Sequence, residues 1–420
     1  MINKTIISIL PRPIWPPYAG QSRLCYFRSL ELRERGYKTI LVEFYFFRMT
    51  RNEEDLEKIS KAFDEVYSIK INALDFFLIF CKSVFNQILS FFPLQTHFLS
   101  SYFLEKKFIN ILNIIEKSNK EIFIHCYSIR TYKLWNIISR SSKSFTIDFV
   151  DSMTLNLKNK LKFVMSLKKL FFLNEFLRTK NFESNLIKYN YLQSIILVSR
   201  NDINYFSFKR NLNNNNNNIP IFESGIGVKP IRINAKEINE NYKKNLGNLL
   251  FFGTLSYEPN KVAIDFLLNN FLPILKANKV KFKLTIAGRN PSRNLIKNIE
   301  IYEEVYLVPN PKNMNQIIDN SFLSLVPIFT GSGQQYKAVE SLSRGTPIII
   351  SSQAANALSL QDGVNCLIAD NSKEYYKCLD NLMNSPYLYE ELAMNGLNYI
   401  DKEFSWKSRV DNLIKNVYKF

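Results

Sequence analysis

Residues 327–351 read PIFTGSGQQYKAVESLSRGTPIIIS, and this stretch decides the fold. An apolar strand ends at Ile328, a glycine-rich loop follows, a helix is expected over 334–344, and a second apolar strand occupies 346–351. Strand, helix and strand in this order are typical of a parallel sheet with a crossover helix. The loop precedes the helix, where free amide groups and the positive end of the helix dipole favour an anion.

The same alternation of short apolar strands and longer helical patterns extends in both directions from this stretch. Strands are expected at 4–10, 38–44, 121–127, 144–150, 194–199, 248–253, 283–288, 324–328, 346–351 and 366–369, with a further helix over roughly 260–277. Between the halves, residues 211–218 read NLNNNNNN, a polar tract with nothing to bury. We therefore expect two doubly wound α/β domains, 1–225 and 226–420, that face a cleft in which ligands bind beyond the strand ends. The last helix is expected to pack back on the first domain.

The composition favours a cytoplasmic protein with an anionic partner. Of 420 residues, 55 are Lys or Arg and 37 are Asp or Glu, so the formal net charge is +18. The five cysteines lack close pairing such as C-x-x-C, which predicts neither disulfides nor a structural metal. Residues 83–104 carry no formal charge, but Asn86, Pro93 and His97 among them make a membrane span costly. No nucleic-acid-binding motif accompanies the positive charge, which argues against nucleic acid as the partner.

Two charged residues of the helix over 334–344 carry the expected chemistry. Lys337 and Glu340 lie three positions apart, so both project from nearly the same helix face. A lysine near the positive end of a helix is unfavourable on its own, and an anionic ligand over the helix start would explain it. Glu340 could then accept hydrogen bonds from ribose hydroxyls, and the alternative is an ordinary exposed ion pair. The spacing matches neither the Walker loop nor the dinucleotide-binding fingerprint.

The run GSGQQYKAVESLSRGTPIII resembles the donor-binding segment of group 1 (family 4) glycosyltransferases. Three other stretches are similar to that family: FFGTLSYEPNKVAIDFLLNNFLPIL at 251–275, TIAGRNP at 285–291 and EFSW at 403–406. The resemblance covers most of residues 247–410. It implies the GT-B fold, with a nucleotide-diphosphate sugar as donor and without a metal or another cofactor.

The resemblance also implies a role for individual residues. Lys337 and Arg289 would neutralise the donor diphosphate and act in catalysis, while Glu340 would bind the ribose. The other donor-binding residues that it implies are Gly20, Gly253, Thr254, Gly331, Ser332, Gly333 and Gln334. Many members of the family carry two glutamates eight residues apart, but Ser332 occupies the earlier position here. The role of that first glutamate, close to the donor sugar, is therefore open.

The first domain carries candidate residues for the acceptor side. Residues 16–42 resemble the first glycine loop and helix of the family, with Gly20 allowing the backbone to approach a ligand. Asp148 and Asp151 could orient an acceptor hydroxyl, or they could cap the next helix and bind loop amides. His125, at the end of an expected strand, is a catalytic candidate whose alternative is a packed core residue.

Residues 151–190 form a basic segment with an apolar component. Eight lysines and arginines face three acidic residues, and leucines and phenylalanines are interspersed. Such a segment suits an anionic membrane surface, and the alternative is a core-packed helix with a solvated lysine face.

Together with the family resemblance, these features predict a metal-independent hexosyltransferase-type enzyme. The resemblance alone implies that it retains the anomeric configuration. Its acceptor would be a saccharide or lipid-linked intermediate of cell-surface polysaccharide or lipopolysaccharide synthesis. It would act in the cytoplasm, at the inner face of the cytoplasmic membrane. The alternatives are a nucleotide-sugar epimerase of the same fold and a catalytically inactive nucleotide-binding module.

Overall fold

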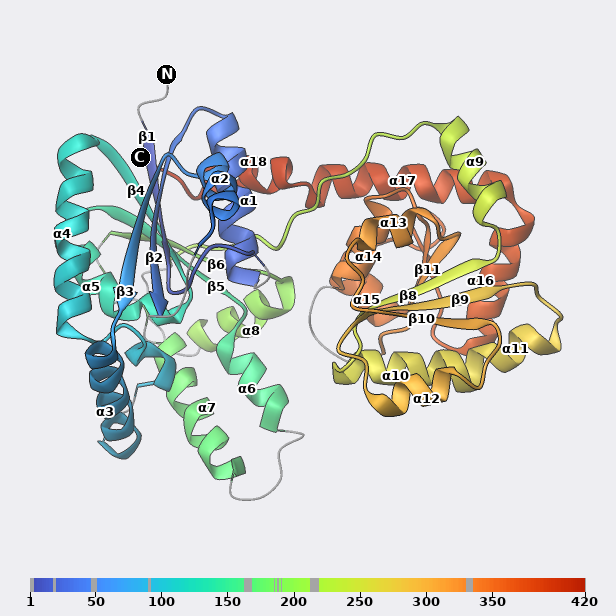
Figure 1. The fold of residues 1–420 in the computed structure, drawn as a ribbon, viewed down its shortest axis with the longest axis horizontal. Helices are drawn as coiled ribbons and strands as arrows, with labels where there is room; N and C mark the ends of the chain where they lie inside the picture. Colours follow the sequence, from blue (N-terminus) through green and yellow to red (C-terminus); the bar gives the residue numbers. More distant parts are fainter. Residues whose placement is uncertain are drawn as a thin grey trace. The chain divides into compact units, whose positions relative to one another are not determined.

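The computed structural model describes residues 4–17, 20–46, 51–89, 92–161, 168–184, 186, 189, 191–211, 219–329 and 335–419. The chain forms two compact units. The first unit comprises residues 1–227 and 406–420, and the second comprises residues 228–405. Each unit is a parallel sheet with helices on both faces (Figure 1).

The sheet of the first unit has the strand order β3-β2-β1-β4-β5-β6-β7, and all of its strand pairs are parallel. The strands are β1 (Lys4–Leu10), β2 (Lys38–Phe46), β3 (Glu65–Ile71), β4 (Glu121–Tyr127), β5 (Ser144–Val150), β6 (Leu192–Leu197) and β7 (Ile221–Glu223). Because the strand order reverses direction beside β1, the fold is doubly wound.

Helices cover both faces of this sheet. They are α1 (Gly20–Glu34), α2 (Glu53–Ala62), α3 (Ala73–Leu89), η1 (Leu94–His97), α4 (Tyr102–Ser118), η2 (Ile129–Thr131), α5 (Tyr132–Arg140), α6 (Met153–Leu161), α7 (Lys168–Ser184), α8 (Arg200–Asn211) and α18 (Trp406–Asn416). On one face, Leu24 of α1 packs in a cluster with Trp406 of α18. On the other face, Phe108 of α4 and Trp135 of α5 pack in a cluster with the strands.

The sheet of the second unit has the strand order β10-β9-β8-β11-β12-β13 and is also parallel throughout. Its strands are β8 (Asn248–Thr254), β9 (Lys283–Arg289), β10 (Val305–Pro309), β11 (Leu323–Val326), β12 (Ile348–Ile350) and β13 (Leu367–Ile368). Its helices are α9 (Ala235–Asn245), α10 (Glu258–Phe266), η4 (Leu267–Phe271), α11 (Leu272–Ala277), α12 (Arg293–Ile299), α13 (Met314–Asp319), α14 (Tyr336–Leu342), α15 (Ser352–Ala357), α16 (Ser372–Asn384) and α17 (Pro386–Phe404).

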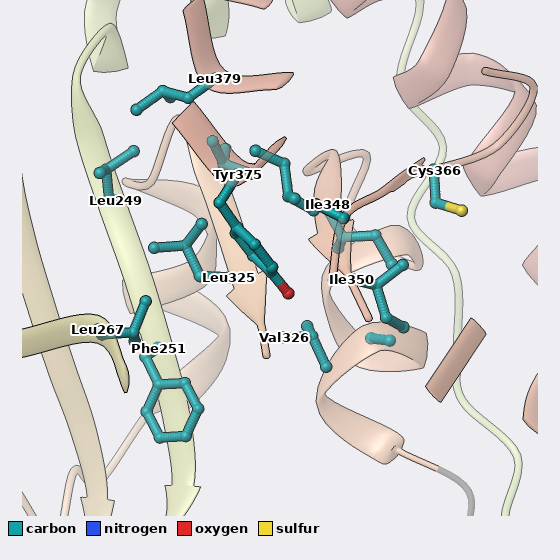
Figure 2. Close-up of a cluster of buried hydrophobic side chains, with 14 of the residues drawn as sticks. Leu249, Phe251, Leu267, Leu325, Val326, Ile348, Ile350, Cys366, Tyr375 and Leu379 are labelled. Carbon is teal, nitrogen blue, oxygen red and sulfur yellow. The ribbon is translucent and has the colours of Figure 1, made fainter. Parts of the chain in front are cut away.

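The core of the second unit holds its central strands against the helices. Figure 2 shows Phe251 of β8, Leu325 of β11 and Ile348 of β12 in the same cluster as Tyr375 of α16. These side chains are fully buried or nearly so. Buried apolar groups of this size each stabilise the fold by about 1.5–3 kcal/mol, so the cluster fixes the positions of the strand ends that follow it.

The C-terminal segment belongs to the first unit. Phe27 of α1 stacks on Trp406 with ring centroids 5.1 Å apart. Arg35 Nε donates to Asp411 of α18 at 2.7 Å, and the hydroxyl of Tyr418 lies 2.8 Å from Nδ1 of His125. Residues 406–419 therefore complete the helical layer that contains α1.

None of the helices in the described ranges is long and apolar enough to cross a membrane.

Candidate functional site

The carboxyl ends of β8 and β9 meet at a pair of glycines. Gly253 pairs with Gly288 and Thr254 pairs with Arg289 in the parallel register. A Cβ atom on Gly288 would lie 1.8 Å from the carbonyl oxygen of Gly253, so a side chain at position 288 would force the two strands apart. Two strand ends can therefore approach closely here, and their last residues, Thr254 and Arg289, are exposed.

Lys337 lies against this edge of the sheet. Its ammonium donates a hydrogen bond to Oδ1 of Asn260 at 2.6 Å and lies 4.3 Å from the ring centroid of Phe251. Asn260 in turn donates from Nδ2 to the carbonyl oxygen of Thr254 at 2.8 Å. The chain of contacts holds the ammonium beside Gly253, where a Cβ atom would lie 3.5 Å from Nζ.

The ammonium of Lys337 is poorly solvated. The residue is 7% exposed, and no carboxylate of the described residues lies within ion-pair distance of it. Burial lowers the pKa of Lys337 to about 7, because desolvation disfavours the charged form. A lysine kept in this state is poised to gain stabilisation from an anion that binds next to it.

Glu340 follows Lys337 by one turn of α14 and is partly buried. Its carbonyl oxygen accepts a hydrogen bond from the hydroxyl of Ser343 at 2.7 Å. The expected donor-binding residues Gly331, Ser332, Gly333 and Gln334 lie outside the described residues. The predicted site residues that the structure brings to one edge of the second sheet are thus Gly253, Thr254, Arg289 and Lys337.

In the first unit, Asp151 lies directly after β5 on a constrained turn. Val150 has a φ of 67°, which is unfavourable for a β-branched residue, and its amide donates to Oδ1 of Asp148 at 2.8 Å. The pKa of Asp151 is raised to about 6, mainly by desolvation and to a smaller extent by the nearby carboxylates of Asp202 and Asp148. The residue as a whole is exposed, although neighbouring atoms partly desolvate its carboxyl group. The turn therefore presents a carboxylate of raised pKa at the carboxyl edge of the sheet.

Gly20 is the first residue of α1, and a Cβ atom built on it meets no atom within 4 Å. Packing therefore does not explain the glycine, and the space beside it is open.

His125 is fully buried in the first unit. Its ring stacks on Tyr127 with centroids 4.2 Å apart, and its Nε2 lies 3.5 Å from Oδ2 of Asp148. Burial lowers the pKa of His125, which keeps the ring neutral. This placement favours the structural alternative for His125.

Asp148, like His125, lies in a buried structural contact. Arg28 and Asp148 are both buried, and Nη1 of Arg28 donates to Oδ2 of Asp148 at 2.5 Å. A second nitrogen of Arg28 donates to the carbonyl oxygen of Ser224 at 2.6 Å. Arg28 thus ties α1 to Asp148 of β5 and to the residues after β7, and Asp151 alone of the two aspartates is exposed.

Sequence reasoning did not identify Asn260. The signal was present, because an asparagine near the start of a helix often hydrogen-bonds to nearby backbone through its side chain, as Asn260 does to Thr254. Its partner Lys337, however, lies 77 positions away in the sequence.

No group of three or more His, Cys, Asp or Glu side chains in the described part of the chain is arranged to hold a metal ion.

Residues 247–385, which include β8, Lys337 and Glu340, match the family model "Glycosyl transferases group 1". An uncharacterized 44.6 kDa protein in the cps region of Klebsiella pneumoniae is 23% identical over 346 residues, 80% of this chain and 81% of the relative. A glycosyltransferase from Rickettsia africae superposes with a TM-score of 0.61 at 11% identity, covering 99% of this chain and 98% of that one.

Two further solved structures are similar along their whole length. HepE of Anabaena in complex with UDP has a TM-score of 0.59 at 11% identity, covering 97% of this chain and 98% of that one. S. aureus TarM in complex with fondaparinux, alpha-GlcNAc-glycerol and UDP has a TM-score of 0.62 at 11% identity, covering 99% and 100%. The chain has the GT-B fold. The family match lies within the second unit.

Proposed function

We propose that the protein is a metal-independent hexosyltransferase of family 4, which transfers a sugar from a nucleotide-diphosphate donor with retention of configuration. The observation that carries the proposal is the buried ammonium of Lys337, held by Asn260 beside the glycine pair of β8 and β9. A cation desolvated to this degree favours a negatively charged ligand. The diphosphate of the donor substrate would supply that charge, and the proposal includes no cofactor.

In the reaction, the bond between the anomeric carbon and the diphosphate oxygen breaks while an acceptor hydroxyl oxygen bonds to the same carbon. The bonding electrons leave with the diphosphate, and the hydroxyl proton leaves with the departing phosphate or to solvent. Lys337 and Arg289 would stabilise the negative charge that develops on the leaving group. Glu340 would bind the ribose, and the segment 331–334 with Gly253 and Thr254 would complete the donor site.

The acceptor side is proposed for the first unit. The open space at Gly20 and the carboxylate of Asp151, on an exposed residue, suit a sugar hydroxyl. We propose a saccharide or lipid-linked acceptor in cell-surface polysaccharide or lipopolysaccharide synthesis. The Klebsiella relative in a cps region supports this setting, and TarM and HepE were solved with UDP.

The protein is proposed to work in the cytoplasm, in peripheral contact with the inner face of the membrane through residues 151–190. Helix α7 supports this contact, since it exposes four large apolar side chains, Leu170, Phe171, Leu173 and Leu177. The same helix exposes Lys168, Lys169 and Lys180, while its two acidic residues, Glu175 and Glu183, are buried. An anionic membrane surface would attract the exposed lysines, and its apolar interior would accommodate the exposed apolar side chains.

Thermal-shift measurements with UDP, GDP, ADP and their sugar conjugates test the donor site. One nucleotide diphosphate should raise the melting temperature of the wild type, and Glu340→Ala should weaken that shift. Lys373→Ala, an exposed lysine of the second unit, is the matched control and should respond like the wild type. No response to any nucleotide would overturn the proposal. Binding without sugar transfer to any acceptor would favour an inactive module, and isomerised donor would favour an epimerase.

A further inference from the structure

Helix α3 buries polar residues and exposes apolar ones. Asp75 and Asn86 are buried, whereas six large apolar residues are exposed: Leu74, Phe76, Phe77, Phe80, Val84 and Phe85. Phe77 and Phe80 are 60% and 58% exposed. A helix that packs on a core shows the opposite arrangement. An exposed apolar patch of this kind marks a surface that binds an apolar partner.

The polar residues fix this orientation of α3. Asp75 accepts a hydrogen bond from the hydroxyl of Ser101, the residue before α4. It also accepts one from the backbone amide of Asn72, the residue before α3, at 3.2 Å. Asn86 donates from Nδ2 to the carbonyl oxygen of Phe92 at 3.0 Å. Exposed Tyr102 of α4 follows Ser101 directly. We refer to Leu74, Phe76, Phe77, Phe80, Val84, Phe85 and Tyr102 as the α3 surface.

A pocket of about 480 Å³ adjoins the α3 surface at Phe85. Its polar lining consists of Lys82, Asn86, His97, Ser100, Glu105 and Lys133. Three buried side-chain atoms of the lining residues lack a hydrogen-bond partner among the described residues: Oδ1 of Asn86, Nε2 of His97 and Oγ of Ser100. Asn86 and Ser100 are 2% and 1% exposed. Buried polar atoms are normally paired, so these atoms point to a ligand.

The charges around the pocket favour an anion. Lys82 and Lys133 line it against one carboxylate, Glu105. The pKa of His97 is lowered to about 4, mainly by burial and to a smaller extent by the positive charges of Lys133 and Lys82, so the ring is neutral at pH 7. Lys82 donates to the carbonyl oxygen of Ser100 and retains further protons for a ligand. The pocket thus offers several donors, and Oδ1 of Asn86 offers an acceptor for a hydroxyl group.

We propose that the α3 surface enters the interface of an anionic bilayer and that the pocket beside it binds the phosphate of a glycerophospholipid head group. The donors and the acceptor in the pocket match a phosphate and the free hydroxyls of a polar head group, such as the head-group glycerol of phosphatidylglycerol. Phe85 at the rim, together with the other phenylalanines of the α3 surface, matches acyl chains. Helix α3 begins two residues after β3 ends, and Figure 1 shows it projecting from the body of the first unit. An apolar helix face beside lysines is the pattern of interfacial helices.

Vesicle sedimentation of the full chain tests the proposal without any sugar substrate, so its outcome is independent of the proposed transferase activity. The vesicles contain phosphatidylcholine alone or phosphatidylcholine mixed with phosphatidylglycerol. Phe77→Ser/Phe80→Ser should weaken binding to the mixed vesicles about tenfold or more. Lys82→Gln/Lys133→Gln should weaken binding to the mixed vesicles by a similar factor while the α7 lysines stay in place.

Matched controls change two exposed apolar residues or remove two positive charges in the second unit. Ile301→Ser/Tyr387→Ser changes two exposed apolar residues of the second unit, and Lys312→Gln/Lys373→Gln removes two exposed lysines there. Both controls should bind the mixed vesicles like the wild type. Circular dichroism melting checks that each variant folds.

Three results would overturn the proposal. The first is wild-type vesicle binding by both α3-side variants. The second is a pair of results: glycerol 3-phosphate raises the melting temperature of the wild type but not of Lys82→Gln/Lys133→Gln, and that variant still binds vesicles like the wild type. These results would assign the pocket to a soluble phosphate. The third is a dimer, seen by analytical ultracentrifugation and lost in Phe77→Ser/Phe80→Ser, without vesicle binding, which would assign the α3 surface to a second copy.

Discussion

Replacing Lys337 by methionine should stabilise the empty protein near neutral pH while removing affinity for a nucleotide diphosphate. Burial lowers the pKa of Lys337 from 10.5 to about 7, so the unfolded chain binds this proton more tightly than the folded one between these values. The free energy of unfolding therefore rises with pH across that window in the wild type. Methionine has no proton to lose, so the variant lacks this rise.

The magnitude follows from the difference in pKa. At about 1.4 kcal/mol per pKa unit, a pKa lowered from 10.5 to about 7 destabilises the folded state by about 5 kcal/mol below pH 7. The variant forfeits about 1 kcal/mol from the hydrogen bond to Asn260 and about 1 kcal/mol from the contact with Phe251. We expect Lys337→Met to be about 2 kcal/mol more stable than the wild type at pH 7 and about equally stable at pH 9.

Hydrogen exchange is the suitable assay, because all three tryptophans (Trp15, Trp135 and Trp406) belong to the first unit and fluorescence would not report on the second. Mass spectrometry of peptides from β8 and α14 gives the opening free energy at both pH values. Lys373→Met, at an exposed lysine of the same unit, is the control and should show no pH-dependent difference. A stability difference between Lys337→Met and wild type that is the same at pH 7 and pH 9 would refute the reasoning.

Three further variants have expected outcomes. Asp148→Asn leaves Arg28 buried without its counter-ion, so urea denaturation followed by tryptophan fluorescence should show a loss of about 3–5 kcal/mol; a loss near zero would contradict the buried ion pair. Gly288→Ala places a Cβ 1.8 Å from the carbonyl oxygen of Gly253, so its melting temperature should drop sharply, by a destabilisation of about 3 kcal/mol or more. With the pKa of Asp151 at about 6, transfer activity in the wild type should fall as pH drops through 6 and this carboxylate becomes protonated. Asp151→Asn should lack that acidic limb, and a pH profile unchanged by the substitution would exclude Asp151 from the reaction.

The central strands of both sheets are readable from the sequence because they are buried on both faces. The predicted strands 4–10, 121–127 and 144–150 are confirmed residue for residue as β1, β4 and β5. The three strands that were missed, β3, β7 and β10, all stand at sheet edges. Strand β3 alternates buried and exposed residues near its end, and β7 has only three residues, so neither forms a continuous apolar run.

The expected long helix over 260–277 is interrupted. The chain forms α10, a π-helical turn over Leu267–Phe271 and α11. Pro273 lies in the first turn of α11 and has no amide proton to donate to the preceding turn, which explains the widened turn.

The site was only partly predictable, for reasons of distance along the chain. Lys337 could be singled out from its position after a glycine-rich loop, but its burial, which lowers its pKa, and its contacts with Asn260 and Phe251 involve another βα unit. In the same way, His125 lies near the end of a strand as a catalytic residue could, yet Tyr418 and Tyr127 enclose it. Spacing indicates which residues share a helix face, whereas solvent access depends on partners remote in sequence.

The return of residues 406–420 to the first unit affects how the protein is made. The ribosome synthesises the second unit, roughly 180 residues, between the two parts of the first unit. At roughly 5–20 residues per second, about 10–35 s pass before Trp406 emerges to stack on Phe27. During that interval the nascent first unit displays the apolar side of α1, whereas the second unit has all of its own strands. The part of the protein that is translated first is therefore the last to be completed, and it is the part that a chaperone would need to shield.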